Sequence, residues 1–174
     1  LDSFKRMAEK CGDDITFINS SKNRKNRMTY LEHSRYRGFD GVAIACIDFE
    51  DPEVAELIQS NIPVVTIDYL FDNHIAVISD NVDGMRELME YICGQGHRRI
   101  AYIHGAPSNV TSNRLSSFYR TAEQFGLDIP DEYVREAPYR DTDKSYHITE
   151  ELLNLKEPPT CILYPDDLAA VGGM

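Results

Sequence analysis

Short apolar runs alternate along this chain with longer segments in which apolar residues recur at helical spacing. One such run, residues 41–47, has no polar interruption and is typical of a parallel strand that is covered on both faces. Asp51 and Pro52 follow it and supply an N-cap and a first-turn proline for a helix. Strands that are separated by helices form parallel sheets through βαβ crossovers. The alternation therefore predicts an α/β fold in which parallel sheets are flanked by helices.

The same patterns assign elements along the whole chain. Predicted strands lie at residues 15–19, 41–47, 64–67, 75–79, 99–104, 134–137 and 161–164. Predicted helices lie at residues 1–11, 22–37, 52–58, 82–94, 115–125, 148–155 and 166–174. Because the series starts afresh near residues 78–81, we predict two lobes, an N-terminal lobe of residues 1–79 and a C-terminal lobe of residues 80–174. The last helical pattern is cut short, and we expect the chain to be truncated at both ends.

The composition is that of a globular protein, with 42% hydrophobic and 27% charged residues among 174. No apolar run approaches the roughly 20 residues that span a bilayer, and the first residues do not form a secretion signal. A membrane protein is therefore not expected. Lys and Arg total 18 against 29 Asp and Glu, which gives a net charge of −11. This charge repels the phosphate backbone, so this segment alone is not expected to bind DNA.

The four cysteines are far apart and form neither a Cys-x-x-Cys pair nor a zinc-ligand spacing with histidine. Three of them lie inside apolar runs, where a free cysteine behaves as a small hydrophobe. We therefore expect buried, reduced thiols in a cytosolic protein rather than disulfides, and no metal site.

Motifs for catalysis are hard to find in this sequence. The loop at residues 105–108 lacks the Lys-Ser/Thr of a phosphate-binding loop, and no Gly-x-Gly-x-x-Gly follows a predicted strand. No Gly-x-Ser-x-Gly nucleophile elbow is present. Asp166 and Asp167 could hold magnesium, but phosphoryl transfer would also need a positive clamp that the sequence does not place. We predict no enzyme, no catalytic residues and no cofactor.

Polar and aromatic residues follow the carboxyl ends of the predicted strands, where open parallel sheets bind their ligands. These residues are Asp48, Asp68, Tyr69, the loop 105–114 with Ser108 and Arg114, Tyr139, Asp166 and Asp167. Planar charged groups make paired hydrogen bonds and an aromatic face stacks on a flat apolar surface, so the set suits a polyol or a nucleobase.

Each candidate also has a structural alternative. Asp68 could cap a loop or form a salt bridge, and Asp166 or Asp167 could serve only as the N-cap of the last helix. Arg114 could pair with a surface carboxylate, and Tyr139 could be a half-buried loop aromatic.

Several motifs occur in a fixed order along the chain. They are residues 62–68 (Ile-Pro-Val-Val-Thr-Ile-Asp), residues 79–81 (Ser-Asp-Asn) with Gly84, residues 96–105 (Gly-His-Arg-Arg-Ile-Ala-Tyr-Ile-His-Gly), Arg114 with Phe118 and Ala122, Gly126 with Leu127, residues 159–162 (Pro-Thr-Cys-Ile) and residues 166–169 (Asp-Asp-Leu-Ala). In this order they resemble the effector-binding domain of the LacI/GalR family of bacterial transcription regulators. The similarity covers essentially the whole chain, and the block that begins at Gly96 is its most specific part.

The resemblance implies two Rossmann-like lobes of the periplasmic-binding-protein type I, with a small effector clamped between them. Complete members of the family begin with a helix-turn-helix domain and a hinge that are absent from this sequence, and that domain would bind operator DNA. The family also implies a homodimer in the cytoplasm, a first strand before Leu1 and closing parts of both lobes after Met174.

The resemblance also assigns ligand-binding residues. Asp68 is similar to the acidic effector contact of the N-terminal lobe, and Arg114 to the arginine of the C-terminal lobe. Tyr139 falls where the family often has a stacking aromatic, and Ser108 in the strand-end loop joins the predicted set. Asp166 stands where the family often has Asn; a carboxylate only accepts hydrogen bonds, whereas an amide also donates, so the substitution changes the pattern expected of the ligand.

The favoured hypothesis is an effector-sensing domain that binds a small molecule, most often a sugar or sugar phosphate in the family and alternatively a purine. The alternative is an exported sugar receptor of a transport system, for which four scattered cysteines would be unusual. The sequence upstream of Leu1 would distinguish them, since a regulator needs a helix-turn-helix there and a receptor needs a signal peptide. An enzyme on the same fold is a third possibility and lacks a positioned nucleophile or base.

Overall fold

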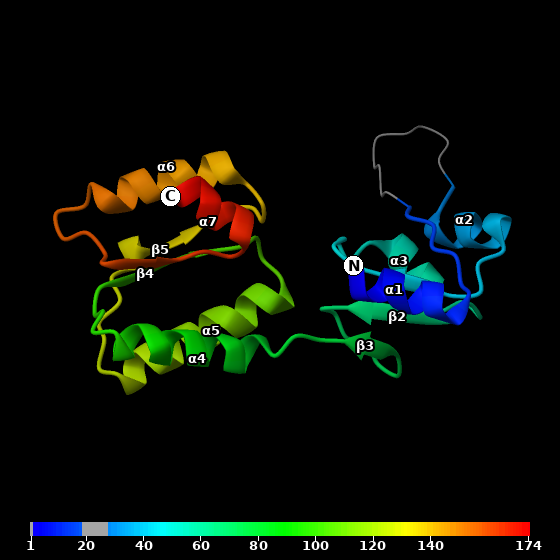
Figure 1. Cartoon of the computed structure of the whole chain (residues 1–174), viewed down its shortest axis with the longest axis horizontal. Helices are drawn as coiled ribbons and strands as arrows, with labels where there is room; N and C mark the ends of the chain where they lie inside the picture. The colour runs from blue at the N-terminus through cyan, green and yellow to red at the C-terminus, as the bar shows by residue number, and fades with distance from the viewer. Residues whose placement is uncertain (1, 19–27) are drawn as a thin grey trace. The chain divides into compact units, whose positions relative to one another are not determined.

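The computed structural model describes residues 2–18 and 28–174, and the chain divides into two compact units (Figure 1). Unit 1 is Leu1–Val77 and unit 2 is Ile78–Met174. Each unit contains a three-stranded parallel sheet of its own. The predicted fold class, α/β with helix-flanked parallel sheets, is therefore confirmed.

The sheet of unit 1 consists of β1 (Val42–Ile44), β2 (Val64–Ile67) and β3 (Ile75–Val77), in that order. Val42 opposes Val64 and Val65 opposes Ile75, and both pairings are parallel. The crossover from β1 to β2 contains helix α3 (Pro52–Ile58), as a parallel connection commonly does. Between β2 and β3 the chain returns through residues 68–74 without a helix.

Helices α2 (Tyr30–Arg37) and α3 form the core of unit 1 together with β1. Helix α2 begins in a capping box, in which the Thr29 hydroxyl accepts from the Glu32 N–H and the Glu32 carboxylate accepts from the Thr29 N–H. Asp51 caps α3 as predicted, with its carboxylate accepting from Glu53 N–H. The buried core residues of the unit are Leu31, Ile44, Val54, Leu57 and Ile58.

Helix α1 (Asp2–Cys11) confirms the predicted first helix and is followed by Gly12, whose φ of +81° is the left-handed conformation that glycine favours after a helix. Phe4 and Met7 lie on its predicted apolar face, yet they are 49% and 58% exposed. The amphipathic pattern therefore forms the helix without burying it against the described part of unit 1.

Two strand predictions in unit 1 are wrong in part. Residues 15–18 form no strand, because no described strand pairs with their backbone groups; Asn19 lies outside the described residues. Strand β1 ends at Ile44, since Cys46 has a left-handed φ of 57° that breaks the extended chain. Val42 is only partly buried and β1 lies at the edge of the described sheet, so it is not covered on both faces as expected.

The predicted helix 22–37 is shorter than expected in its described part. Its helical residues are those of α2, and residues 22–27 lie outside the described residues. The polar segment before Thr29 has no helical spacing of apolar residues, so the capping box marks the start of the helix better than composition does.

Unit 2 is a three-layer sandwich (Figure 1). Its strands are β4 (Ile100–His104), β5 (Val134–Glu136) and β6 (Cys161–Leu163), and its helices are α4 (Asn81–Gly94), α5 (Asn109–Gln124), α6 (Thr142–Leu153) and α7 (Asp167–Gly173), with a short 3-10 helix at Asp131–Tyr133. The sheet order is β5-β4-β6 and all pairs are parallel. Helices α4 and α5 cover one face of the sheet, and α6 and α7 lie on the other.

The central strand β4 supplies both hydrophobic cores of unit 2. Ile100 and Tyr102 point to the α4–α5 layer, where they pack in one cluster with Met89 and Phe118. Ala101 and Ile103 point to the α6 side of the sheet and belong to a second cluster that contains Ile148 and Leu152. Because successive side chains of a strand face opposite sides, a run buried on both faces must be apolar throughout. Residues 100–103 of β4 meet this condition, and His104 at the end of the strand is only partly buried.

The cysteines only partly fulfil the expectation of burial. Cys93 on α4 is buried and Cys161 on β6 is partly buried, whereas Cys11 and Cys46 are exposed. Cys11 lies on the uncovered helix α1, and Cys46 lies in the turn that ends β1. None of the helices in the described ranges is long and apolar enough to cross a membrane.

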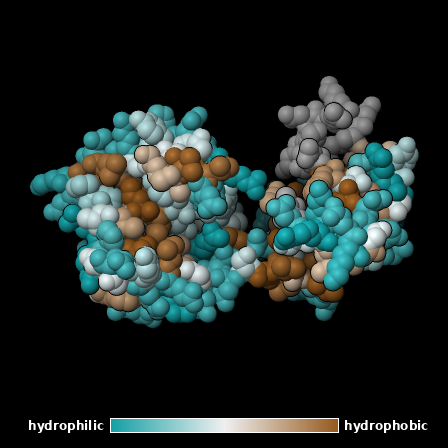
Figure 2. Space-filling model, viewed as in Figure 1, coloured by the Kyte–Doolittle hydropathy of each residue, from teal (hydrophilic) through white to brown (hydrophobic). Residues whose placement is uncertain are grey.

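Hydrophobic side chains also reach the surface of unit 2 between its two helical layers (Figure 2). Leu88 on α4 is 43% exposed, while the next residue, Met89, is fully buried. The two neighbours therefore differ in environment: Met89 belongs to the core, and Leu88 lies at the margin of that core.

We expect Met89→Ala to lower the free energy of unfolding of unit 2 by about 2 to 5 kcal/mol, because it leaves a cavity beside Phe118 in the α4–α5 core. Leu88→Ala is the matched control and should cost roughly 1 kcal/mol or less, since much of its side chain is already in water. Urea denaturation followed by circular dichroism measures both. Equal costs for the two variants would contradict this assignment of the helix faces.

Candidate functional site

Four of the five predicted ligand-binding residues lie at one edge of unit 2. Ser108 begins α5 after β4, Tyr139 follows β5, Asp166 follows β6, and Arg114 lies within α5. They come together because parallel strands all end at the same edge of a sheet. Asp68 belongs to unit 1, where it directly follows β2.

Arg114 is the half-buried cation of this edge, and two neutral oxygens hold it. Its Nε donates to Asn81 Oδ1 at 2.8 Å, and Nη1 donates to the Pro165 carbonyl at 3.0 Å. The remaining guanidinium N–H groups have no hydrogen-bond partner among the described residues. The sequence alternative in which Arg114 pairs with a surface carboxylate is not what the structure shows, and the guanidinium keeps donors for a ligand.

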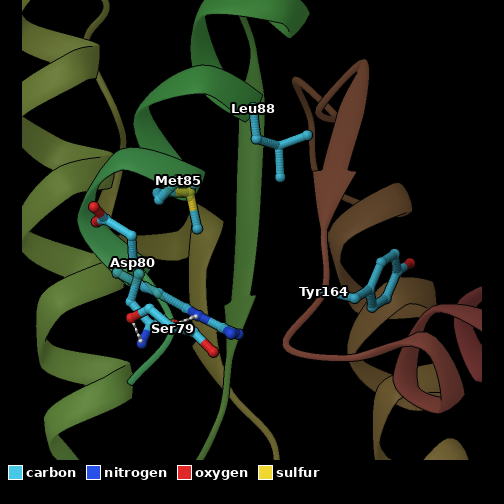
Figure 3. A pocket seen from close by; sticks show the side chains of 8 residues that line it. Ser79, Asp80, Met85, Leu88 and Tyr164 are labelled. Atoms are coloured by element: carbon cyan, nitrogen blue, oxygen red, sulfur yellow. Dashed lines mark hydrogen bonds between the residues drawn. The ribbon is translucent and has the colours of Figure 1, made fainter. Parts of the chain in front are cut away.

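A pocket of about 260 Å³ lies beside Arg114 (Figure 3). It is lined by Ser79, Asp80, Asn81, Gly84, Met85, Leu88, Arg114 and Tyr164. Met85 and Leu88 form an apolar wall on α4, across from the end of β6. The Tyr164 ring turns away toward α6, where its hydroxyl bonds to Thr149 at 2.8 Å.

Thr111 fixes the direction of the hydrogen bonds around Tyr139. The Thr111 hydroxyl has one proton, and it donates to the Ala106 carbonyl at 2.7 Å. It must therefore accept from the Tyr139 hydroxyl at 2.9 Å and from the Ser108 hydroxyl at 3.1 Å. Both donors are thus committed to Thr111, so Tyr139 still offers its ring and the acceptor side of its oxygen.

The Tyr139 ring lies directly against the backbone of Gly105. A methyl group on Gly105 would overlap the Cζ, Cε2 and hydroxyl atoms of that ring, so glycine is required here by close approach. The hydrogen bond to Thr111 holds the same hydroxyl end of the ring. The hydroxyl end of the aromatic predicted to stack on a ligand is therefore fixed by Gly105 and Thr111 together.

Asp166 and Ser108 both act as helix N-caps. The Asp166 carboxylate caps α7 by accepting from Ala169 N–H at 3.0 Å, and its other oxygen accepts from Arg140 N–H at 2.8 Å. The second bond joins the loop of Tyr139 to the loop after β6. Ser108 caps α5 by accepting from Thr111 N–H at 3.1 Å. Ligand contact by either residue stays a prediction.

Asp68 occupies a strained position at the end of β2. Its φ of 63° is left-handed, and its N–H donates to the Val77 carbonyl of β3 at 2.9 Å. Next to it, the Tyr69 ring stacks on Phe49 with centroids 4.6 Å apart. Unit 1 therefore also presents an acid and an aromatic at the carboxyl end of its sheet, and the effector role of Asp68 stays a prediction.

Tyr102 lies beneath the site in the core of unit 2. Burial raises the pKa of its phenol to about 12; the nearby Arg114 cation opposes this shift and Tyr139 adds to it. A charged phenolate is disfavoured there because the group is cut off from water. Tyr102 therefore stays neutral near neutral pH, where it belongs to the hydrophobic core and does not give up its proton.

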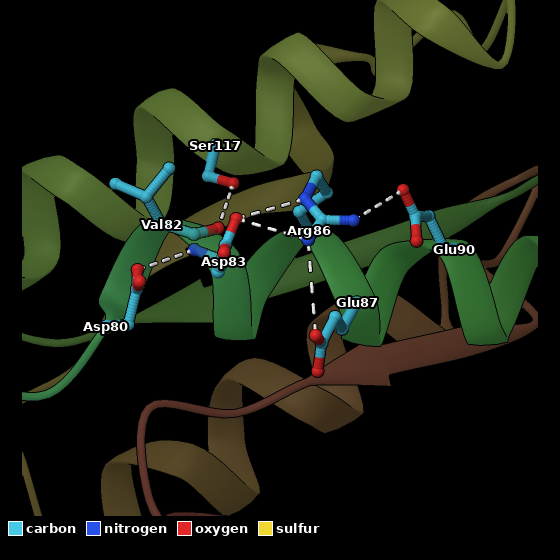
Figure 4. A network of polar contacts seen from close by, with 7 residues as sticks. All are labelled: Asp80, Val82, Asp83, Arg86, Glu87, Glu90 and Ser117. Carbon is cyan, nitrogen blue, oxygen red and sulfur yellow. Dashed lines mark hydrogen bonds and ion pairs between the residues drawn. The ribbon is translucent and has the colours of Figure 1, made fainter.

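A second arginine of unit 2 has a different environment. Arg86 on the outer face of α4 donates to Asp83 and to Glu90 and lies 4.0 Å from Glu87 (Figure 4). Glu90 and Asp83 raise the pKa of Arg86, chiefly through the hydrogen bond to Glu90. Its guanidinium is engaged by surface carboxylates, which makes Arg86 a natural reference for Arg114.

Two residues of the site were not singled out from the sequence. Asn81 and Thr111 are both buried and each contacts a predicted residue far along the chain. Asn81 stands in the Ser-Asp-Asn motif at residues 79–81, and Thr111 stands three residues after the N-cap Ser108. Both could have been noticed as polar residues at helix starts. No group of three or more potential metal ligands occurs in the described ranges 2–18 and 28–174.

Comparison with known proteins agrees with the geometry. The family of periplasmic binding proteins and sugar-binding domains of the LacI family matches residues 1–174. The PurR transcriptional repressor of Salmonella arizonae, of helix-turn-helix type, is 24% identical over 168 residues, which are 94% of this chain and 49% of the repressor. The chain thus spans about half the length of the curated relatives it matches.

Solved structures of LacI-family regulators have the same fold. A regulatory protein of this family from Chloroflexus aggregans superimposes with a TM-score of 0.81 at 27% identity, over 100% of this chain and 63% of that one. A transcriptional regulator from Mycobacterium smegmatis gives a TM-score of 0.74 at 25% identity, over 95% of this chain and 62% of that one.

We expect Gly105→Ala to destabilise unit 2 by about 1 to 3 kcal/mol, because the added methyl group overlaps the Tyr139 ring. In a Tyr139→Ala background the same substitution should cost much less. Gly84→Ala on α4 is the control, since its methyl group meets open space and alanine favours a helix by up to about 1 kcal/mol. Urea denaturation of the four variants measures the coupling, and an equal cost of Gly105→Ala in both backgrounds would disprove the contact.

We expect Tyr102 to make unfolding easier at alkaline pH. The unfolded phenol loses its proton near pH 10 and the folded one near pH 12, so its contribution is full below pH 10 and is lost as the pH rises toward 12. A shift of this size corresponds to roughly 2 to 3 kcal/mol. Denaturation at a series of pH values should show a shallower alkaline loss in Tyr102→Phe than in the wild type; parallel pH profiles would refute the shift.

Proposed function

The chain belongs to the family of periplasmic binding proteins and sugar-binding domains of the LacI family, and we propose on this basis that it is the effector-sensing domain of a bacterial transcriptional regulator. The regulators among its relatives support this choice over a transport receptor. In this proposal, units 1 and 2 are the two lobes of the domain, and Asp68 contributes from the first lobe. The protein binds its effector and does not convert it.

The proposal rests on the hydrogen bonding of the Arg114 guanidinium. Its guanidinium is oriented by Asn81 and Pro165, and its other donors face no described partner. The fixed ring of Tyr139 belongs to the same edge of the sheet. Oriented donors beside an aromatic face suit a small polar ligand with a flat apolar side, such as a sugar, a sugar phosphate or a purine.

The proposed mechanism is a coupling between effector binding and DNA binding. An effector shifts an equilibrium between two states only by its different affinity for them, which typically amounts to about 1 to 3 kcal/mol. Operator DNA would be bound by a helix-turn-helix domain outside residues 1–174, in a cytoplasmic homodimer whose paired readers match paired half-sites. The net charge of −11 fits a domain that does not itself hold DNA.

We expect a thermal-shift screen of sugars, sugar phosphates and purines to find a compound that raises the melting temperature of this chain, since a ligand that binds only the folded state stabilises it. Arg114→Ala should weaken binding of that compound by about 10- to 100-fold, the effect of losing hydrogen bonds from a charged group. Arg86→Ala is the matched control and should bind normally, because Arg86 is held by carboxylates on the outer face of α4.

Isothermal titration calorimetry gives the affinities of these variants. A ligand that binds Arg114→Ala as tightly as the wild type would remove Arg114 from the site. A secretion signal directly upstream of Leu1 in the gene would favour the transport receptor instead.

A further inference from the structure

Asn81 joins the candidate ligand contact to the place where the chain enters unit 2. It is the first residue of α4, and it lies four residues after Val77, the last residue of unit 1. Its side chain is buried, with 7% of the residue exposed. Its amide oxygen accepts from Arg114 Nε at 2.8 Å and its amide nitrogen donates to the Ser79 carbonyl at 3.1 Å.

Only one orientation of the Asn81 amide satisfies both partners. Arg114 can only donate and the Ser79 carbonyl can only accept, so the amide oxygen must face Arg114 and the amide nitrogen must face Ser79. Reversing the amide would place two donors together on one side and two acceptors on the other. A buried amide in this position is a directional link between a guanidinium and a backbone carbonyl.

The Ser79 carbonyl is held twice by the same residue. The Asn81 backbone N–H also donates to it, at 2.9 Å, and Asp80 between them has φ −75° and ψ 80°. These values describe an inverse γ-turn, a tight three-residue turn found where strands end and loops begin. The connecting segment therefore enters α4 in one defined conformation, to which the Asn81 side chain adds a second bond.

The start of α4 does not need the Asn81 side chain for its own support. Asp80 caps the helix by accepting from Asp83 N–H at 2.9 Å, and the Ser117 hydroxyl of α5 donates to the Val82 carbonyl at 2.6 Å (Figure 4). These two bonds satisfy the first turn and dock it on α5. If the Asn81 side chain served only to stabilise the start of α4, it would repeat what the bonds from Asp80 and Ser117 already do.

We propose that Asn81 is a positioning residue that orients the Arg114 guanidinium and ties it to the connecting turn at Ser79, so that the position of Arg114 and the conformation of the connector depend on each other. The inference rests on the proposed function in that Arg114 is taken as the ligand contact. A ligand that drew on the guanidinium would thereby act on the segment through which the chain passes between its two units.

The test measures Arg114 without any ligand. Nuclear magnetic resonance of the whole chain resolves the arginine Nε–H signals, and Arg114→Lys identifies the one that belongs to Arg114. Hydrogen exchange at this Nε–H is expected to rise about tenfold in Asn81→Ala, which removes its acceptor. Ser117→Ala is the control, because it removes a buried bond to the same helical turn that does not involve Arg114.

Asn81→Asp separates the two halves of the link. The carboxylate still accepts from Arg114, so exchange at Nε should stay as slow as in the wild type or become slower. It has no N–H for the Ser79 carbonyl and repels it, so backbone amides at residues 78–81 should exchange several-fold faster. This variant also keeps the test decisive if Asn81→Ala does not fold.

Three results would overturn the proposal: unchanged Nε exchange in Asn81→Ala, an equal rise in Ser117→Ala, or loss of Nε protection in Asn81→Asp. Because no ligand is added, failure of this inference is distinct from failure of the effector screen. A chain with no effector could still show the link, and a chain with an effector could lack it.

Discussion

The burial of β4 on both faces is the constraint on which unit 2 depends. Its alternating side chains fill one core against α4 and α5 and another against α6, so the strand has no face left for water. A sheet covered in this way can meet solvent only at its edges and at the ends of its strands. Polar side chains that could reach a ligand are thereby placed in the loops after β4, β5 and β6, where Ser108, Tyr139 and Asp166 lie, or on the helix that follows β4, where Arg114 lies.

Some polar groups at this edge already have hydrogen-bond partners within the protein, and others can still bond to a ligand. Both carboxylate oxygens of Asp166 accept hydrogen bonds from backbone N–H groups, and the hydroxyls of Ser108 and Tyr139 donate to Thr111. Guanidinium donors of Arg114 and the ring of Tyr139 remain available. These groups can hold a small polar molecule through hydrogen bonds and a flat apolar contact.

Periodicity predicted the elements well wherever burial decides the structure. Strand β2 coincides with its predicted run at residues 64–67, and α4 lies on its predicted apolar spacing. The predicted helices 115–125 and 148–155 overlap α5 and α6, which begin six residues earlier at Asn109 and Thr142, because their first turns carry polar caps and few apolar residues. The run at residues 15–18 failed because a strand needs a partner that a local pattern cannot reveal, and β1 was overextended because the left-handed turn at Cys46 leaves no mark on hydrophobicity. Arg114 and Tyr139 were accessible as strand-end residues, whereas the roles of Asn81 and Thr111 depend on contacts 33 and 28 residues away along the chain.

The first turn of α4 shows how such distant contacts would matter for the proposed effector-sensing function. Three bonds of different origin meet there: a local cap from Asp80, a docking bond from Ser117, and the amide of Asn81 that reaches Arg114. The first two hold the helix start through groups that do not contact Arg114, and only the third links this turn to Arg114. In the proposed function such a division is useful, because the group that contacts the ligand is bonded to the connecting turn at Ser79 while the cap and the docking bond hold the helix independently.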